Sequence, residues 1–158
     1  MTDLAKARAL ALLLPAALMA GALGSQYLGG LYPCEMCHWQ RWPHYAAILL
    51  ALAAIALGRS EASRPLVLFA GLAILISGGI GAFHAGVEYG WWEGFTTCTA
   101  PAASGSADDL LKAIMSAPLI RCDQPQWTLF GISLAGYNAI ISITGALTIF
   151  ALCLKRPR

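Results

Sequence analysis

Residues 65–87, PLVLFAGLAILISGGIGAFHAGV, contain no Asp, Glu, Lys or Arg. Three further charge-free stretches lie between Arg8 and Glu35, Arg41 and Arg59, and Asp123 and Lys155. A helix needs roughly 20 apolar residues to cross a membrane, so each stretch has room for one crossing. The sequence therefore predicts a single all-α domain over residues 1–158, an integral membrane antiparallel four-helix bundle. The predicted spans are residues 9–27, 42–57, 65–87 and 131–152, and the predicted outer loops are residues 28–41 and 88–128.

The distribution of basic residues predicts the orientation of this bundle. If the N-terminus is cytoplasmic, seven Lys and Arg residues fall in inner segments and only three, Arg41, Lys112 and Arg121, in outer ones. This agrees with the positive-inside rule, so both termini are expected in the cytoplasm. No basic cluster exceeds the short tail at residues 155–158, which argues against nucleic-acid binding.

Small residues are frequent in the third predicted span. They allow close approach of helices in lipid, where hydrophobicity alone does not drive association. We therefore expect a neighbouring helix to pack closely on this span, over Gly71, Ser77, Gly78, Gly79 and Gly81.

Four of the five cysteines fall in the outer loops, and Cys153 lies alone at the inner end of the last span. An outer compartment is normally oxidising, which favours disulfides over a zinc site, so no metal is expected. The two-residue gap between Cys34 and Cys37 is typical of a reactive dithiol. Cys98 and Cys122 are far apart in sequence and fit either a redox pair or a structural disulfide.

Arg41 is the first candidate partner of the dithiol. On a helix, Cys34, Cys37 and Arg41 share one face, and a fixed cation near Cys37 would stabilise its thiolate. An arginine that merely anchors a helix end fits the same position. The helical geometry itself is in doubt, because Pro43 disfavours helix at Trp42.

The three histidines are expected at different depths in the membrane. His84 lies near the outer end of the third span, and an ionisable residue at membrane depth is a functional candidate, although a hydrogen-bonded structural histidine is the alternative. His38 and His44 are expected at the wetter edge of the membrane, where a structural role is favoured.

The chain resembles the DsbB family of disulfide bond formation proteins. The resemblance covers every span except the first, in the family's order, and four outer cysteines with an arginine four residues after the second make it specific. It is carried by residues 32–37 (YPCEMC), 39–41 (WQR), 83–88 (FHAGVE), 91–94 (WWEG), 97–98 (TC), 121–123 (RCD) and 127–136 (WTLFGISLAG). One departure is Gln40, where some members carry an acid.

The resemblance implies a thiol:quinone oxidoreductase in the bacterial inner membrane, with its active cysteines periplasmic. Its Cys98/Cys122 disulfide would oxidise a soluble DsbA-like thiol oxidase, with Cys98 forming the mixed disulfide. Electrons would pass to Cys34 and Cys37, with Cys122 pairing transiently with Cys34, and on to ubiquinone or menaquinone from the membrane pool. Cys37 would face the quinone, with Arg41 and His84 beside it.

Two alternatives come from other classes of protein. Residues 34–38, CEMCH, match the attachment pattern of a c-type haem, which suggests a membrane cytochrome. That assignment leaves Arg41, Cys98 and Cys122 unexplained. The second alternative is a non-enzymatic membrane protein whose loops are held by structural disulfides. Mild thiols should reduce catalytic disulfides but not structural ones, which distinguishes the two cases.

Overall fold

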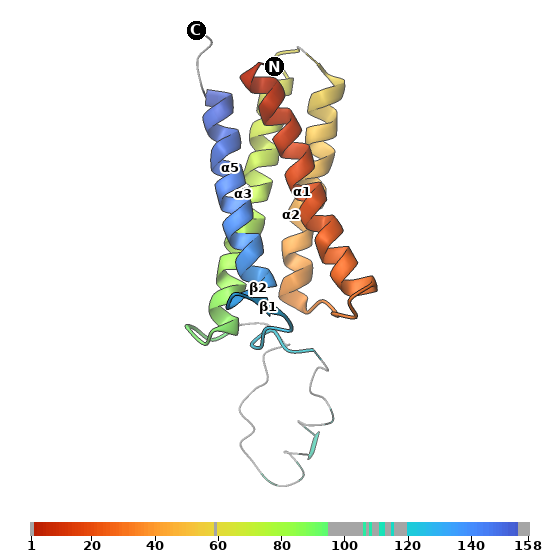
Figure 1. Ribbon diagram of the computed structural model, residues 1–158, viewed down its shortest axis with the longest axis vertical. Coiled ribbons are helices and arrows are strands. Elements are labelled where there is room, and N and C mark those ends of the chain that lie inside the picture. The colour runs from red at the N-terminus through yellow and green to blue at the C-terminus, as the bar shows by residue number, and fades with distance from the viewer. Residues whose placement is uncertain are drawn as a thin grey trace.

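The computed structural model describes residues 2–58, 60–94 and 120–154, together with the separate positions 106, 108, 111, 112 and 115. Four long helices form the bundle: α1 (Asp3–Tyr27), α2 (Glu35–Ala56), α3 (Ser63–Glu88) and α5 (Leu134–Leu154). Successive helices run in opposite directions, and α1 begins at the end of the bundle where α5 finishes (Figure 1). The predicted all-α four-helix bundle is confirmed. We call the end where α2 begins, next to Cys34 and Cys37, the dithiol end.

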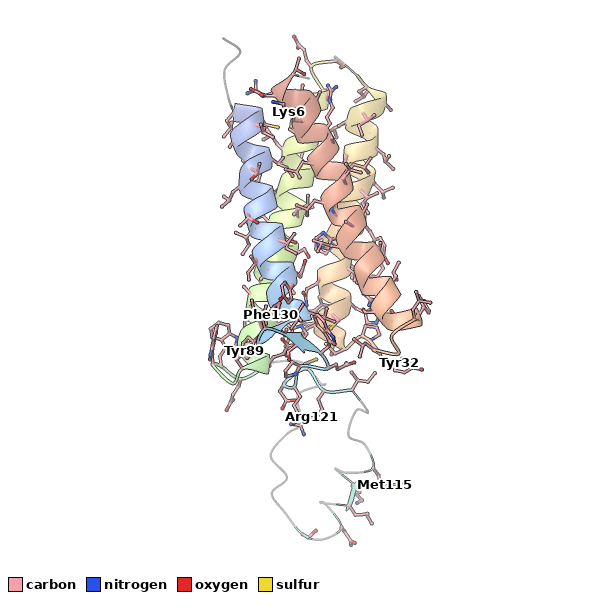
Figure 2. The ribbon with its side chains drawn as sticks, viewed as in Figure 1. Lys6, Tyr32, Tyr89, Met115, Arg121 and Phe130 are labelled. Atoms are coloured by element: carbon pink, nitrogen blue, oxygen red, sulfur yellow. The ribbon has the colours of Figure 1, made fainter. Side chains whose placement is uncertain are left out.

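Many large apolar side chains point outward from the bundle, whose side chains are drawn in Figure 2. Among the described residues, α1, α3 and α5 are long and apolar enough to cross a membrane, judged by length and composition. The polar residues in the first half of α2 lower its mean hydropathy, but its second half still exposes Leu49, Leu52 and Ile55. All four helices thus present large apolar side chains outward, as a membrane protein requires.

Helix α3 packs against both α2 and α5 and is the centre of the bundle. A Cβ atom added at Gly71 or Gly78 would lie within 3.0 Å of a side-chain atom of α5, and one at Gly81 would lie 3.0 Å from the Ala135 backbone oxygen. The expected close helix contact is therefore present at these three glycines. Gly79 faces outward, with no such neighbour within 4 Å among the described residues.

Helix α2 begins earlier than the predicted second span. Glu35 is its first residue, so the CEMC motif and Arg41, placed in a loop from sequence, lie at a helix start. The helix continues through Pro43, whose position had made helical geometry doubtful. Gln40 and His44, on either side of Pro43, are both buried against neighbouring helices. This packing outweighs the local preference of the residue before proline.

A short hairpin leads into α5. Strands β1 (Thr128–Leu129) and β2 (Ile132–Ser133) pair antiparallel around Phe130 and Gly131, which both have positive φ. The hydroxyl of Tyr89 donates to the Gly131 oxygen at 2.9 Å and accepts from the Ser133 nitrogen at 2.8 Å. The hairpin is thereby fixed to the end of α3, which places the start of α5 at the dithiol end.

Candidate active site

The first turn of α2 holds the dithiol together. Cys34 is the N-cap residue, and its sulfur accepts a hydrogen bond from the Cys37 backbone N–H at 3.3 Å. The Sγ atoms of Cys34 and Cys37 lie 3.0 Å apart, and both cysteines are free. The hydrogen bond with Cys37, and then burial, raise the pKa of the Cys34 thiol, so Cys37 is the sulfur that ionises first.

A third sulfur lies beside this pair. Cys122 is fully buried and disulfide-bonded, whereas Cys98 lies outside the described residues. The Sγ atoms of Cys34 and Cys122 and a ring nitrogen of His84 lie within 4.8 Å of one another. Three such atoms could ligate a soft metal ion, but a sulfur already in a disulfide is not available as a thiolate ligand. The arrangement instead suits thiol–disulfide exchange.

Contacts of the loop around Cys122 keep it at the dithiol end. The side-chain amide of Gln126 donates to the Tyr32 backbone oxygen at 2.7 Å, which joins this segment to the chain just before the CEMC motif. Arg121 and Asp123 flank Cys122 and form a two-point ion pair at 2.8 and 2.5 Å. The Arg121 guanidinium holds the pKa of Asp123 below its usual range.

His84 connects the sulfurs to the interior of the bundle. Its side chain projects from α3 and is 1% exposed. Its Nε2 lies 3.5 Å from Cys34 Sγ and 3.7 Å from Glu88 Oε1, and its Nδ1 lies 2.9 Å from the Gln40 amide nitrogen. His84 is thus hydrogen-bonded inside the bundle and also lies beside the Cys34 sulfur, and its functional role stays a prediction.

Polar residues that sequence reasoning did not select continue from His84 into the bundle. Asn138 of α5 donates to Gln40 Oε1 at 2.8 Å, and its own oxygen lies 3.0 Å from His44 Nε2. Ser77 of α3 lies 2.9 Å from the same His44 nitrogen. A polar side chain inside an apolar helix is itself a signal of function, and this signal could have identified Asn138 and Ser77.

His44 corrects one sequence-based expectation. It was placed at the wetter membrane edge, but it is only 3% exposed, because α2 starts early and turns this face toward α3 and α5. Its Nδ1 and the Glu88 Oε2 are the buried side-chain polar atoms that have no hydrogen-bond partner within the described part of the chain.

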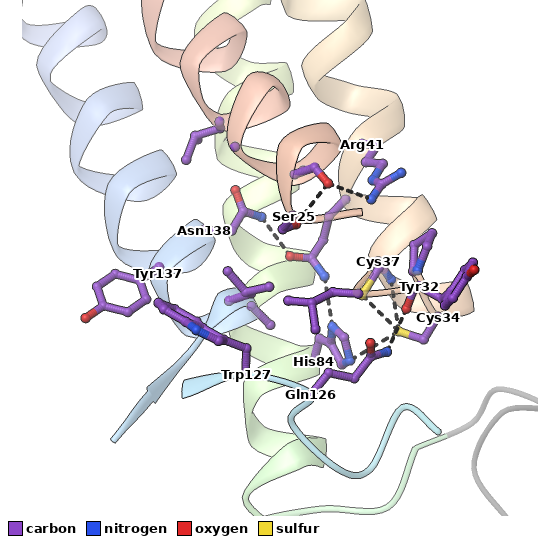
Figure 3. A pocket seen from close by; sticks show the side chains of 18 of the residues that line it. Ser25, Tyr32, Cys34, Cys37, Arg41, His84, Gln126, Trp127, Tyr137 and Asn138 are labelled. Carbon is purple, nitrogen blue, oxygen red and sulfur yellow. Dashed lines mark hydrogen bonds between the residues drawn. The ribbon is translucent and has the colours of Figure 1, made fainter. Parts of the chain in front are cut away.

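Arg41 reaches toward α1. One guanidinium nitrogen donates to Gln26 Oε1 at 2.6 Å and the other to the Ala22 oxygen at 3.3 Å. Figure 3 shows the guanidinium on the α1 side of the site, with the dithiol and His84 on the other. Arg41 therefore joins α1 to α2, and its predicted role toward Cys37 stays a prediction.

A cavity of about 230 Å³ opens at the dithiol end, beside these groups. Its polar lining includes the side chains of Cys37, Arg41, His44, His84 and Glu88. Ala17, Leu18 and Met19 of α1 and Leu134 of α5 supply apolar walls. Figure 3 shows Trp127, Tyr137 and Asn138 at one side of the site and the cysteines at the other. The cavity thus places a reactive thiol, a fixed cation and apolar walls around one space.

Comparisons with known proteins agree with this arrangement. A family model described as "Disulfide bond formation protein DsbB" matches residues 5–152. A protein named Disulfide bond formation protein B from Polaromonas sp. (strain JS666 / ATCC BAA-500) is 30% identical, over 90% of this chain and 86% of its own length. A protein of the same name from Polaromonas naphthalenivorans (strain CJ2) is 31% identical, over 85% and 84% of the two chains. No solved structure gives a significant match to the chain.

Proposed function

The chain belongs to the DsbB family and is a membrane oxidoreductase of disulfide bond formation, and from this premise we propose that it oxidises a soluble DsbA-like dithiol and reduces a membrane quinone. The observation that carries the proposal is the position of Cys122. Its disulfide-bonded sulfur lies within 4.8 Å of Cys34, which belongs to a separate free dithiol beside a cavity. Two redox pairs in contact form a relay, whereas a structural disulfide needs no such neighbour.

The first exchange involves the outer pair. A thiolate of the reduced partner attacks Cys98, the Cys98–Cys122 bond breaks, and Cys122 leaves as a thiolate. The second thiolate of the partner then attacks its own sulfur in the mixed disulfide and releases Cys98. The partner has lost two electrons to Cys98 and Cys122, and no other oxidant is consumed.

The second exchange moves this electron pair inward. The Cys122 thiolate attacks Cys34 of an oxidised Cys34–Cys37 pair, and Cys37 leaves as a thiolate. Cys98 then attacks Cys122, the Cys34–Cys122 bond breaks, and Cys34 leaves as the second thiolate. The outer disulfide is restored and the inner dithiol is reduced, the combination of a bonded Cys122 and free Cys34 and Cys37 that the structure holds.

The residues around the cavity fit a quinone. Arg41 supplies donors for a carbonyl oxygen, and His44 and Glu88 are further polar residues that line the same cavity. Bound there, a quinone supplies a two-electron acceptor. Cys34 and Cys37 both line the cavity, and Cys37 is assigned as the donor because its hydrogen bond with Cys34 lowers the pKa of the Cys37 thiol.

The energetic argument requires such an acceptor. DsbA has a reduction potential near −120 mV, which makes its disulfide a strong oxidant. Two cysteine pairs alone would stop after one turnover, because the electrons would have nowhere to go. The chain of DsbA, DsbB and quinone is the known source of oxidising power in the periplasm, which also fits a location of these cysteines on the outer side of the inner membrane.

The test is anaerobic quinone reduction by the purified protein with a reduced DsbA-like protein as electron donor. We expect quinone loss in proportion to partner disulfide formed, and no quinone loss when the partner is omitted. A Cys122→Ser variant, which keeps the inner dithiol, should lose the partner-dependent reaction. Partner oxidation without quinone reduction, or no reaction with the intact protein, would refute the proposal.

A further inference from the structure

Two backbone carbonyls fix the orientation of the buried amides of Gln40 and Asn138. The Gln40 Nε2 lies 3.2 Å from the Met36 backbone oxygen, and the Asn138 Nδ2 lies 3.2 Å from the Ser77 backbone oxygen. A carbonyl oxygen only accepts hydrogen bonds, so an amide nitrogen must face it in each case. Exchanging the nitrogen and oxygen of either amide would bring two acceptors together inside the bundle.

This orientation determines which nitrogen of His84 carries the proton. The Gln40 Nε2 donates to His84 Nδ1 at 2.9 Å, so Nδ1 is the bare nitrogen of a neutral ring and Nε2 bears the hydrogen. The groups next to Nε2 agree, because Cys34 Sγ at 3.5 Å, Glu88 Oε1 at 3.7 Å and the backbone oxygen of Cys122 can all accept a hydrogen bond. The N–H of His84 therefore faces the sulfur of Cys34.

The donor-to-acceptor direction is the same for every hydrogen bond in the series that leads from His44 to Cys34. The Asn138 amide nitrogen donates to Gln40 Oε1 at 2.8 Å, and the Asn138 oxygen is left as acceptor for His44 Nε2 at 3.0 Å. Figure 3 shows the chain passing from Asn138 through the amide beneath it to His84 and on to Cys34. Every donor points toward the cysteines, and aligned hydrogen bonds in a buried chain strengthen one another.

We infer that Gln40 and Asn138 are positioning residues that hold His84 in the tautomer whose Nε2–H donates to Cys34. This inference rests on the proposed exchange between Cys34 and Cys122. In its last step the Cys34–Cys122 bond breaks, the electron pair of that bond stays on Cys34, and Cys34 leaves as a thiolate. His84 stabilises the departing charge by a hydrogen bond without giving up its proton, so the charges on both sides of the step balance.

The opposite tautomer would act against this step. It would place a nitrogen lone pair toward a sulfur that is gaining negative charge, and the two would repel. Gln40 prevents it because its amide nitrogen, held by the Met36 oxygen, cannot accept a hydrogen bond from an Nδ1–H. Asn138 acts one contact further away, because it holds the oxygen end of the Gln40 amide.

The tautomer can be read directly from the nitrogen NMR spectrum of the purified protein labelled in its histidines, which number three in the chain. A His84→Gln variant assigns the His84 signals. We expect wild-type His84 to be neutral with hydrogen on Nε2. Gln40→Met, which keeps the side-chain length but removes the amide, should give a mixture of tautomers, whereas Ser142→Ala, which removes a different hydrogen bond to Asn138, should leave His84 unchanged.

The second readout is the rate of partner oxidation. In Gln40→Met, part of the protein has the wrong His84 tautomer and lacks the hydrogen bond to the departing Cys34 thiolate. Because this is a hydrogen bond to a charged group, we expect the exchange to slow about 10- to 100-fold. Hydrogen on Nδ1 in the wild-type protein, or an unchanged tautomer and rate in Gln40→Met, would overturn the inference, and the wild-type spectrum decides even if a variant misfolds. The spectrum needs neither partner nor quinone, so a failure of the proposed function appears separately, as a wild-type protein that does not oxidise its partner.

Discussion

Two neighbouring glycines of α3 should respond in opposite ways to the same substitution. A Cβ at Gly78 would lie 2.8 Å from the Ile143 side chain and 3.1 Å from both the Ile143 nitrogen and Ser142 Cβ. At least one of these α5 atoms must move, and overpacking of this kind typically costs about 1–3 kcal/mol. At Gly79 a Cβ meets nothing within 4 Å among the described residues. Alanine there removes the flexibility of glycine and stabilises a helix by about 0.5–1 kcal/mol.

The same gain from alanine applies at Gly78, so it cancels between the two variants. The free energies of unfolding of Gly78→Ala and Gly79→Ala should therefore differ by about 1–3 kcal/mol, the cost of overpacking alone. The measurement is unfolding of the purified protein in mixed micelles by titration with a denaturing detergent. Gly79→Ala is the matched control, because it has the same chemistry one residue away on the outward face. Equal free energies for the two variants would show that α3 and α5 do not meet at Gly78, and the close helix contact would be wrong.

Three further predictions concern the site and its orientation. Arg41→Lys should keep partial activity with a raised Michaelis constant for quinone, and Arg41→Met should be far worse. Gln26→Leu removes one of the two hydrogen bonds from Arg41 to α1 and should leave that constant unchanged. If Gln26→Leu reproduces Arg41→Met in steady-state kinetics, Arg41 is only a helix anchor. Cys98→Ser should abolish oxidation of the soluble partner while quinone binding, measured by equilibrium titration, is retained; partner turnover in this variant would contradict the assignment. In intact cells an impermeant thiol reagent should label reduced Cys98 and leave Cys153 unlabelled, and the reverse pattern would invert the proposed topology.

Much of the fold follows from the sequence because the interior of a membrane excludes charge. The four charge-free stretches predicted four helices, and the small residues of the third predicted a close neighbouring helix, which the structure identifies as α5. The predicted second span was drawn from the charge-free stretch after Arg41, whereas helix α2 begins at Glu35. The doubt about helix at Trp42 came from a local rule for the residue before Pro43. The burial of Gln40 and His44 that overrides it depends on helices distant in sequence.

The site was only partly predictable, for a related reason. Cys34, Cys37, Arg41 and His84 stand out because each is reactive or charged in an unusual place. The connection from His84 through Gln40 to Asn138 depends on how three helices are rotated about their axes. A single polar residue in each of three separate segments does not reveal that rotation. The direction of the hydrogen bonds between these residues could therefore be determined only from the structure.

The hydrogen bond from Gln126 to the Tyr32 oxygen has a consequence for reaction order. Cys122 and Cys34 belong to one chain, and this hydrogen bond helps to hold the segments that carry them side by side, with the two sulfurs within 4.8 Å of each other. Well-oriented groups of this kind behave as though each were present at an effective molarity of about 10⁵ M or more. The internal exchange should then be independent of protein concentration and outpace attack by free small thiols, so that only the soluble partner and the quinone have to arrive by diffusion.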